Sequence, residues 1–150
     1  MKTKREAIKV KKTRRGAALV EAALVLPLFV TVTLGIVEFG RGMMVAQLVT
    51  NAAREGARLA MFDGSSNSDV ETTIRDFLTD AADVTAGDVS ISITVTPAPG
   101  NDDPANQLLA CGTRDLITIT VGVPFDKVSF VSGDYLNGKT LRSKAVIRHE

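Results

Sequence analysis

The organisation of the chain follows from one stretch, Arg14-Arg15-Gly16-Ala17-Ala18-Leu19-Val20-Glu21. A basic run ends there, a glycine follows at Gly16, and an apolar segment, residues 17–37, begins with Glu21 as its only charged residue. The segment has 21 residues, so as a helix it is about 31 Å long, which matches the hydrocarbon core of a bilayer. We therefore predict a helix that spans the lipid bilayer and carries a small domain after it.

Charge is distributed unequally along the 150 residues. Residues 1–16 hold eight of the 18 basic and one of the 17 acidic residues, a net charge of +7, and residues 17–150 have a net charge of −6. A basic flank favours the cytoplasmic side of a membrane span. We expect a cytoplasmic N-terminus and an acidic, extracytoplasmic remainder. No aromatic residues interleave with the basic run, so nucleic acid is not favoured as a partner.

Three interpretations of the apolar segment compete. A secretory signal peptide has a shorter apolar core, and residues 36–39 form a poor cleavage site. A plain signal anchor fits the length, but it leaves Glu21 without a partner, and a carboxylate at mid-membrane costs about 2.5–3.5 kcal/mol. In the third interpretation the chain is cut after Gly16, and the new ammonium group of Ala17 on one subunit pairs with Glu21 of a neighbour. The positive end of the helix dipole would also favour Glu21 there.

These residues carry a resemblance to a known family. The basic run, Gly16 and Glu21 resemble type IV pilin-like precursors, and residues 15–27, 35–41 and 51–58 together resemble the TadE-like family of tight-adherence (Tad/Flp) pilus proteins. The resemblance covers residues 14–62. It implies cleavage between Gly16 and Ala17 by a membrane prepilin peptidase and assembly with other pilin and pseudopilin subunits on platform proteins. It also implies a bacterial inner-membrane location and a role in pilus biogenesis, secretion and cell adhesion.

Two departures from better-known pilins refine what the resemblance implies. Ala17 stands where major type IV pilins usually have phenylalanine, so methylation of this residue stays open. Ala22 follows Glu21, where the short major pilin of Tad systems typically has tyrosine. The resemblance therefore implies a minor pilin or pseudopilin rather than the major subunit.

Three further positions in the first helix have predicted roles. Pro27 removes a backbone hydrogen bond, so we expect a helix kink there, or local melting when the subunit leaves the bilayer. Glu38 and Arg41 are three residues apart where the segment leaves the membrane, a spacing that suits an ion pair. We interpret these two residues as interfacial anchors.

The remaining sequence predicts an α+β, pilin-like fold. Residues 43–62 continue the helix with an apolar stripe that packs on its own domain or on other subunits. Ser68 and Glu71 predict a capping box for a short helix over residues 69–83. Alternating patterns predict three strands of an antiparallel sheet in sequential order. The strands cover residues 88–96, 114–123 and 139–148. We divide the chain into a leader (1–16), a transmembrane and extended helix (17–62) and a head domain (63–150).

The residue types for catalysis or metal binding are sparse. Cys111 and His149 are the only cysteine and histidine, so no zinc spacing and no internal disulfide exist, and Cys111 is a plain loop thiol or an intermolecular bridge. We expect His149 to be exposed. Asn101, Asp102 and Asp103 lie together without a recognisable calcium loop. We expect no enzyme activity, no metal and no cofactor. An unprocessed bitopic membrane protein with an extracytoplasmic partner-binding domain is the alternative function.

Overall fold

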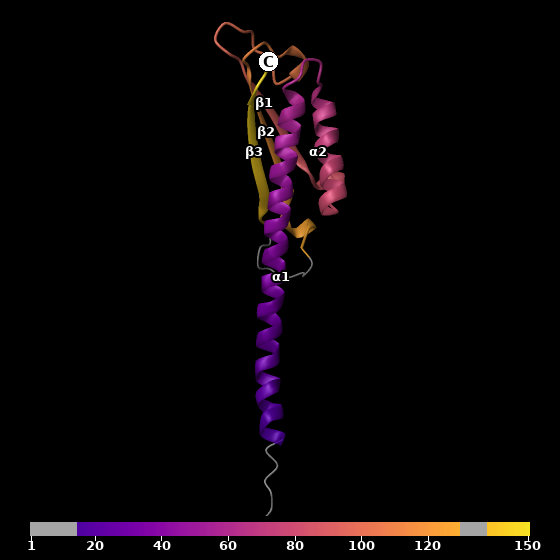
Figure 1. The fold of residues 1–150 in the computed structure, drawn as a ribbon, viewed down its shortest axis with the longest axis vertical. Coiled ribbons are helices and arrows are strands. Elements are labelled where there is room, and N and C mark those ends of the chain that lie inside the picture. Colours follow the sequence, from indigo (N-terminus) through magenta and orange to yellow (C-terminus); the bar gives the residue numbers. More distant parts are fainter. Residues whose placement is uncertain (1–14, 130–137) are drawn as a thin grey trace, which may run out of the picture. The chain divides into compact units, whose positions relative to one another are not determined.

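The computed structural model describes residues 15–129 and 138–150, and these residues fall into two compact units that divide between Ile36 and Val37. Residues 1–14, most of the proposed leader, lie outside the described part. The elements run along the chain as shown in Figure 1, in the order α1 (Arg15–Ala60), α2 (Asn67–Ala82), β1 (Ser90–Thr96), β2 (Leu116–Pro124) and β3 (Thr140–Arg148). Short 3₁₀ helices lie at Ala86–Asp88, Leu108–Ala110 and Phe125–Lys127. The predicted α+β class is confirmed.

The first unit contains helix α1 up to Ile36, and its side chains have no interior to pack into. Residues 16–34 are all exposed, although most of them are apolar. Apolar residues occur on every side of this helix, a pattern that is typical of helices surrounded by other apolar matter. The long apolar helix that the sequence predicts is therefore present.

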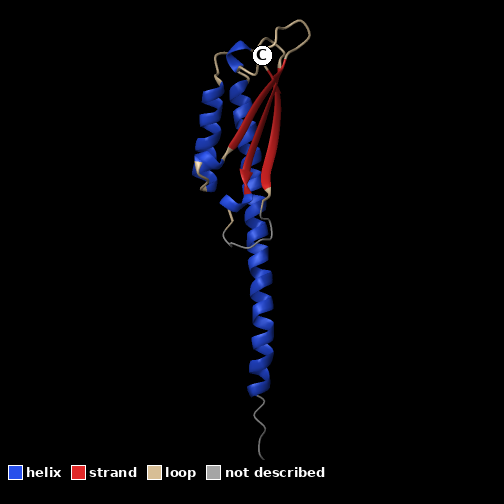
Figure 2. Cartoon of the chain, turned by 180° about the vertical axis from the view of Figure 1, so that it is seen from behind, coloured by secondary structure: helices blue, strands red, loops and turns tan. Residues whose placement is uncertain are grey.

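In the second unit, three strands form an antiparallel sheet in the order β1-β2-β3 (Figure 2). The alternating patterns located all three, with ends within two residues of those predicted. The four isoleucine and valine side chains of β2 that point inward, at positions 117, 119, 121 and 123, are fully buried. Their neighbours on the ladder are inward residues of β1 and β3, because the register pairs Ile119 with Ile93 and with Ala145.

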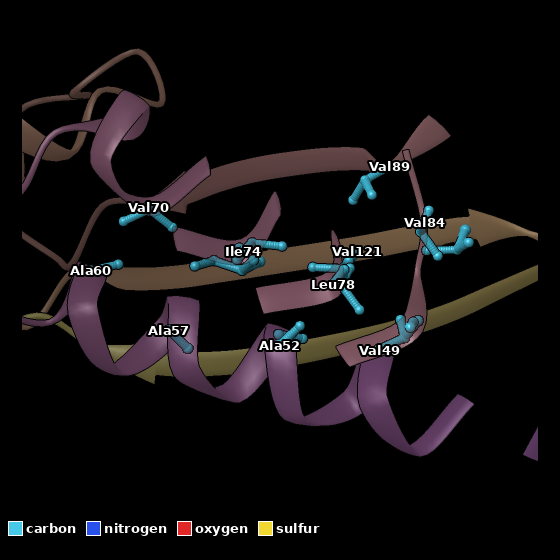
Figure 3. Close-up of a cluster of buried hydrophobic side chains, with 14 of the residues drawn as sticks. Val49, Ala52, Ala57, Ala60, Val70, Ile74, Leu78, Val84, Val89 and Val121 are labelled. Carbon is cyan, nitrogen blue, oxygen red and sulfur yellow. The ribbon is translucent and has the colours of Figure 1, made fainter. Parts of the chain in front are cut away.

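The core of the second unit lies between the sheet and two helices. Figure 3 shows Val49 and Ala52 of α1 and Ile74 and Leu78 of α2 pointing into the same cluster as Val121 of β2. The predicted apolar stripe within residues 43–62 thus packs on its own domain. Gly56 permits a close approach of the two helices, because a Cβ atom there would lie 2.4 Å from Cδ1 of Ile74.

The start of α2 differs from the predicted one. The N-cap is Ser66, and the capping box pairs it with Asp69 rather than pairing Ser68 with Glu71. The Asp69 carboxylate accepts from the Ser66 backbone N–H at 3.1 Å and from the Ser66 hydroxyl at 2.6 Å. These hydrogen bonds also lower the pKa of Asp69. Both serine–acid pairs have the right spacing, and the earlier one begins the helix because Asn67 then reaches the loop before β2.

Candidate assembly and membrane segment

The predicted processing and assembly residues lie at the beginning of α1. Gly16, Ala17 and Glu21 are all helical and exposed. Ala17 and Glu21 are four residues apart, so they share one face of the helix, about 6 Å apart along its axis. Within the described residues, no side chain forms an ion pair or a hydrogen bond with Glu21. The roles of these three residues stay predictions.

The helix that carries them is long and apolar enough to cross a membrane, by length and composition. Its most apolar window has no buried residue. Large side chains such as Leu24, Phe29 and Ile36 are more than half exposed. In water this surface would be strongly unfavourable, since burial of apolar surface is worth about 25 cal/mol per Å². The segment therefore requires an apolar partner, either lipid or protein.

Pro27 lies inside α1, which continues through it. The missing N–H of Pro27 leaves the carbonyl of Ala23 without its usual helical donor. The carbonyl of Pro27 itself accepts from the Thr31 hydroxyl at 2.8 Å, and Thr33 makes the same bond to Phe29. These bonds satisfy the two polar side chains within the helix. The kink at Pro27 stays a prediction.

Glu38 and Arg41 belong to the second unit, where both contact the segment after β2. Glu38 is 3% exposed and accepts a hydrogen bond from the Ser129 hydroxyl. Arg41 donates from Nε to the Val128 carbonyl. Their predicted role as interfacial anchors remains a prediction. Sequence spacing alone had no signal for Ser129, which is 91 residues from Glu38 in the chain.

A buried carboxylate organises the loop between β1 and β2. Asp115 is fully buried and accepts from the Ala98 N–H at 2.8 Å, from the Asn101 side-chain amide at 2.6 Å and from the Gly112 N–H at 2.8 Å. The bond from Ala98 and then that from Asn101 lower the pKa of Asp115, against the effect of its burial. Asn101 thus serves a structural carboxylate that the sequence did not single out.

The remaining candidates for chemistry are scattered. Asp102 and Asp103 are exposed, and no group of three potential metal ligands exists among the described residues. Cys111 is half-buried, and burial and then the charge of Asp115 raise the pKa of its thiol. A raised pKa keeps the thiol protonated and unreactive at neutral pH.

The expectation of an exposed His149 was wrong. The residue is 5% exposed, and Nε2 lies 3.5 Å from the Asp63 carboxylate, while Nδ1 is buried without a hydrogen-bond partner among the described residues. The backbone explains this position. The His149 N–H donates to the backbone carbonyl of Asp115, and the His149 carbonyl accepts from the backbone N–H of Arg114. Two extra ladder-like bonds therefore extend β3 past Arg148 and turn the imidazole inward.

Residues 16–58 match the model of the family described as TadE-like protein. The resemblance read from the sequence is thereby confirmed, and it is consistent with a TadE-like protein of Tad pilus systems. No curated protein and no solved structure matches the chain. The family is structural rather than enzymatic, and it implies association with a membrane and with other pilin subunits. Together with the apolar helix, the match indicates a single-pass membrane protein of a pilus system.

Proposed function

We propose that this chain, whose residues 16–58 carry the TadE-like match, is a minor pilin or pseudopilin of a Tad-type pilus. A prepilin peptidase removes the leader after Gly16, and the mature subunit assembles through its N-terminal helix with other pilin and pseudopilin subunits. Platform proteins at the bacterial inner membrane receive it, with the head on the extracytoplasmic side. The assembly machinery is of the type IV pilus kind, and the assembled pilus serves adherence to surfaces.

The observation that supports this proposal is the isolated carboxylate of Glu21 on a helical segment whose side chains are all exposed. Glu21 lies among exposed apolar side chains, and no described residue compensates its charge. In a bilayer such a charge is costly, by about 2.5–3.5 kcal/mol at the centre and less near an end. A partner that exists only in the assembly would convert this cost into a preference for assembly.

Cleavage after Gly16 would supply that partner. Ala17 would then carry an ammonium group one helical turn before Glu21. Two parallel helices that are offset by about 6 Å along their axes place the ammonium of one beside the carboxylate of the other. The same pair would fix the axial register between subunits. No such group exists in an uncleaved chain, so processing would control assembly.

Gly16→Leu tests the processing step. We expect the leader to stay attached, because the peptidase needs close approach to the backbone at this position, and the precursor should be larger by about 16 residues on a gel and by mass spectrometry. Gly35→Leu, which changes a second glycine of the same helix where an added Cβ would have no neighbour within 4 Å, is the matched control and should be processed normally. A wild-type chain that retains its leader in its own host would instead support the unprocessed bitopic protein.

Glu21→Ala tests the ion pair separately from cleavage. We expect normal or improved membrane insertion, complete leader removal and at least a tenfold loss of incorporation into the sheared pilus fraction, since a pair worth about 1.4 kcal/mol changes an equilibrium tenfold. Glu21→Asp, which keeps the charge, should retain partial incorporation. Normal incorporation of Glu21→Ala would refute the proposed pair.

A further inference from the structure

The sheet of the second unit has an outer face that carries positive charge only. Both helices pack on the opposite face, so the outward positions of β1 and β3 are exposed, and most of those on the central strand β2 are half-buried. On β3 these positions are Arg142, Lys144 and Arg148 together with Thr140 and the half-exposed Val146, and on β1 and β2 they are serine, threonine, one leucine, one glycine and one proline. We call this surface the basic sheet face. No described residue forms an ion pair with its three cations.

A hollow lies at one end of the basic sheet face. The strand register sets Thr96, Leu116 and Arg148 side by side across the three strands. These residues, together with Pro99 and the exposed Arg114, line a hollow of about 440 Å³. Two arginines and an apolar floor suit a carboxylate on a short aliphatic stem. The positive surface therefore includes a recess as well as a flat area.

Helix α2 has the opposite charge on its outer side. Asp69, Asp76, Asp80 and Asp83 recur at spacings of seven, four and three, which places them on one side of the helix. All four are exposed, and Val70, Ile74 and Leu78 occupy the buried side. We call this surface the acidic helix face. The one basic residue of α2, Arg75, donates to the carbonyls of Ala86 and Val89 instead.

Neither charged face is explained by the stability of one isolated head. Asp80 lies in the last turn of α2, where the helix dipole disfavours a carboxylate, and no basic residue occurs in that turn. Arg142 and Lys144 are like charges two positions apart on one strand face, opposite Gly122 and Thr120. Cations on the edge strand β3 also discourage edge-to-edge strand pairing. Anions at the same positions would do so as well, and therefore edge protection does not explain why the charge is positive.

We propose that the basic sheet face of one copy of this chain binds the acidic helix face of a second copy. The two faces have charges of opposite sign and are similar in length. Arg142 to Arg148 spans about 20 Å of strand, and Asp69 to Asp83 spans about 21 Å of helix. The contact uses a different surface on each partner, so each copy keeps one face free and the interaction can repeat along a filament. It goes beyond the cleavage and the helix ion pair proposed above.

Charge reversal on full-length chains tests this contact. The sheet variant carries Arg142→Glu and Lys144→Glu, and the helix variant carries Asp76→Lys and Asp80→Lys. Each is produced in the host membrane with two different tags, and co-purification in detergent at low salt is measured. We expect each variant alone to lose self-association at least tenfold, because like charges then face each other. A mixture of the two variants should recover it to within about twofold, since opposite charges face each other again.

Controls separate the contact from folding and from other partners. Arg54→Glu, at an exposed position of α1, should leave co-purification unchanged, and thermal unfolding should be the same for all variants. Unaltered self-association of the sheet variant would overturn the proposal in favour of edge protection. Failure of the mixture to recover would overturn it as well. So would retained self-association combined with lost binding to phosphatidylglycerol vesicles, which would identify lipid as the occupant.

A last arm separates this inference from the proposed function. In a Gly16→Leu background the leader remains, but both charged faces are intact, so co-purification should be unchanged. Co-purification that requires cleavage would overturn the head contact and leave the proposed function standing. If the wild-type chain is never cleaved in its own host and co-purification is unchanged, the proposed function would be overturned and the head contact would stand.

Discussion

Helix α1 contains two stretches with many apolar residues and opposite surroundings. Residues 16–34 are exposed throughout, whereas Val45, Val49, Ala52, Ala53 and Ala60 are completely buried. The difference lies in the pattern, because the first stretch is apolar on every side and the second keeps its polar residues on one side. The comparison teaches that apolar composition alone does not create a core. An interior needs a polar side that can face water.

Leucine truncation should give the largest difference between the two regions. Leu78 is fully buried in the head, and Leu24 is 74% exposed. We expect Leu78→Ala to lower the free energy of unfolding of the head by about 2–5 kcal/mol and Leu24→Ala to leave it within about 0.5 kcal/mol. Thermal unfolding of the full chain in detergent measures both. Equal losses for the two variants would break the comparison.

Acid should affect the head through Asp115. Its pKa is lowered in the folded state, chiefly by the Ala98 and Asn101 hydrogen bonds, so its contribution is complete above the unfolded value of about 4 and is lost as the pH falls through the folded pKa. We expect Asp115→Asn to cost about 1–3 kcal/mol at neutral pH, because the amide presents N–H groups to N–H donors.

The pH dependence provides the control for this prediction. The gap between wild type and Asp115→Asn in urea unfolding should shrink as the pH drops below about 4. Asp102→Asn, an exposed neighbour in the same loop, should follow wild type at every pH. A gap that stays constant down to pH 2 would show that charge on Asp115 is irrelevant.

The smallest effect should come from the cap of α2. Ser66→Ala removes the N-cap hydroxyl and should cost about 1 kcal/mol, whereas Ser68→Ala should change stability by less than about 0.5 kcal/mol. Circular dichroism during chemical unfolding measures both. The result sharpens the contrast with α1, whose first turn contains no acidic residue. The opposite order would restore the cap at Ser68 that the sequence predicted.

Features set by local periodicity could be predicted from the sequence. The alternation of Ile117, Ile119 and Val121 located the central strand and its buried face. The small-residue stripe around Ala52 and Ala53 located the helical side of the core. These patterns repeat with the backbone period itself, so neighbouring residues reinforce one another.

Features that depend on distant partners could not be predicted. His149 is buried because its backbone pairs with residues 114 and 115, and Glu38 contacts Ser129 across 91 positions. Asp115 had no periodic signal, since its donors come from two separate turns of one loop. The choice between Ser66 and Ser68 rested on the bonds of Asn67 to the loop near Asn106. Each of these positions follows from tertiary contacts rather than from sequence spacing.

The bare oily surface of residues 16–34 has a consequence for how the subunit changes surroundings. Lipid acyl chains and the helices of neighbouring subunits are similarly apolar surroundings. The free energy of most of this segment therefore changes little when it is transferred from one to the other. The direction of transfer must then be decided by the rare groups that distinguish the two media. Within residues 16–34 Glu21 is the only charged residue, so under the proposed function the partner of its carboxylate would decide the direction of transfer.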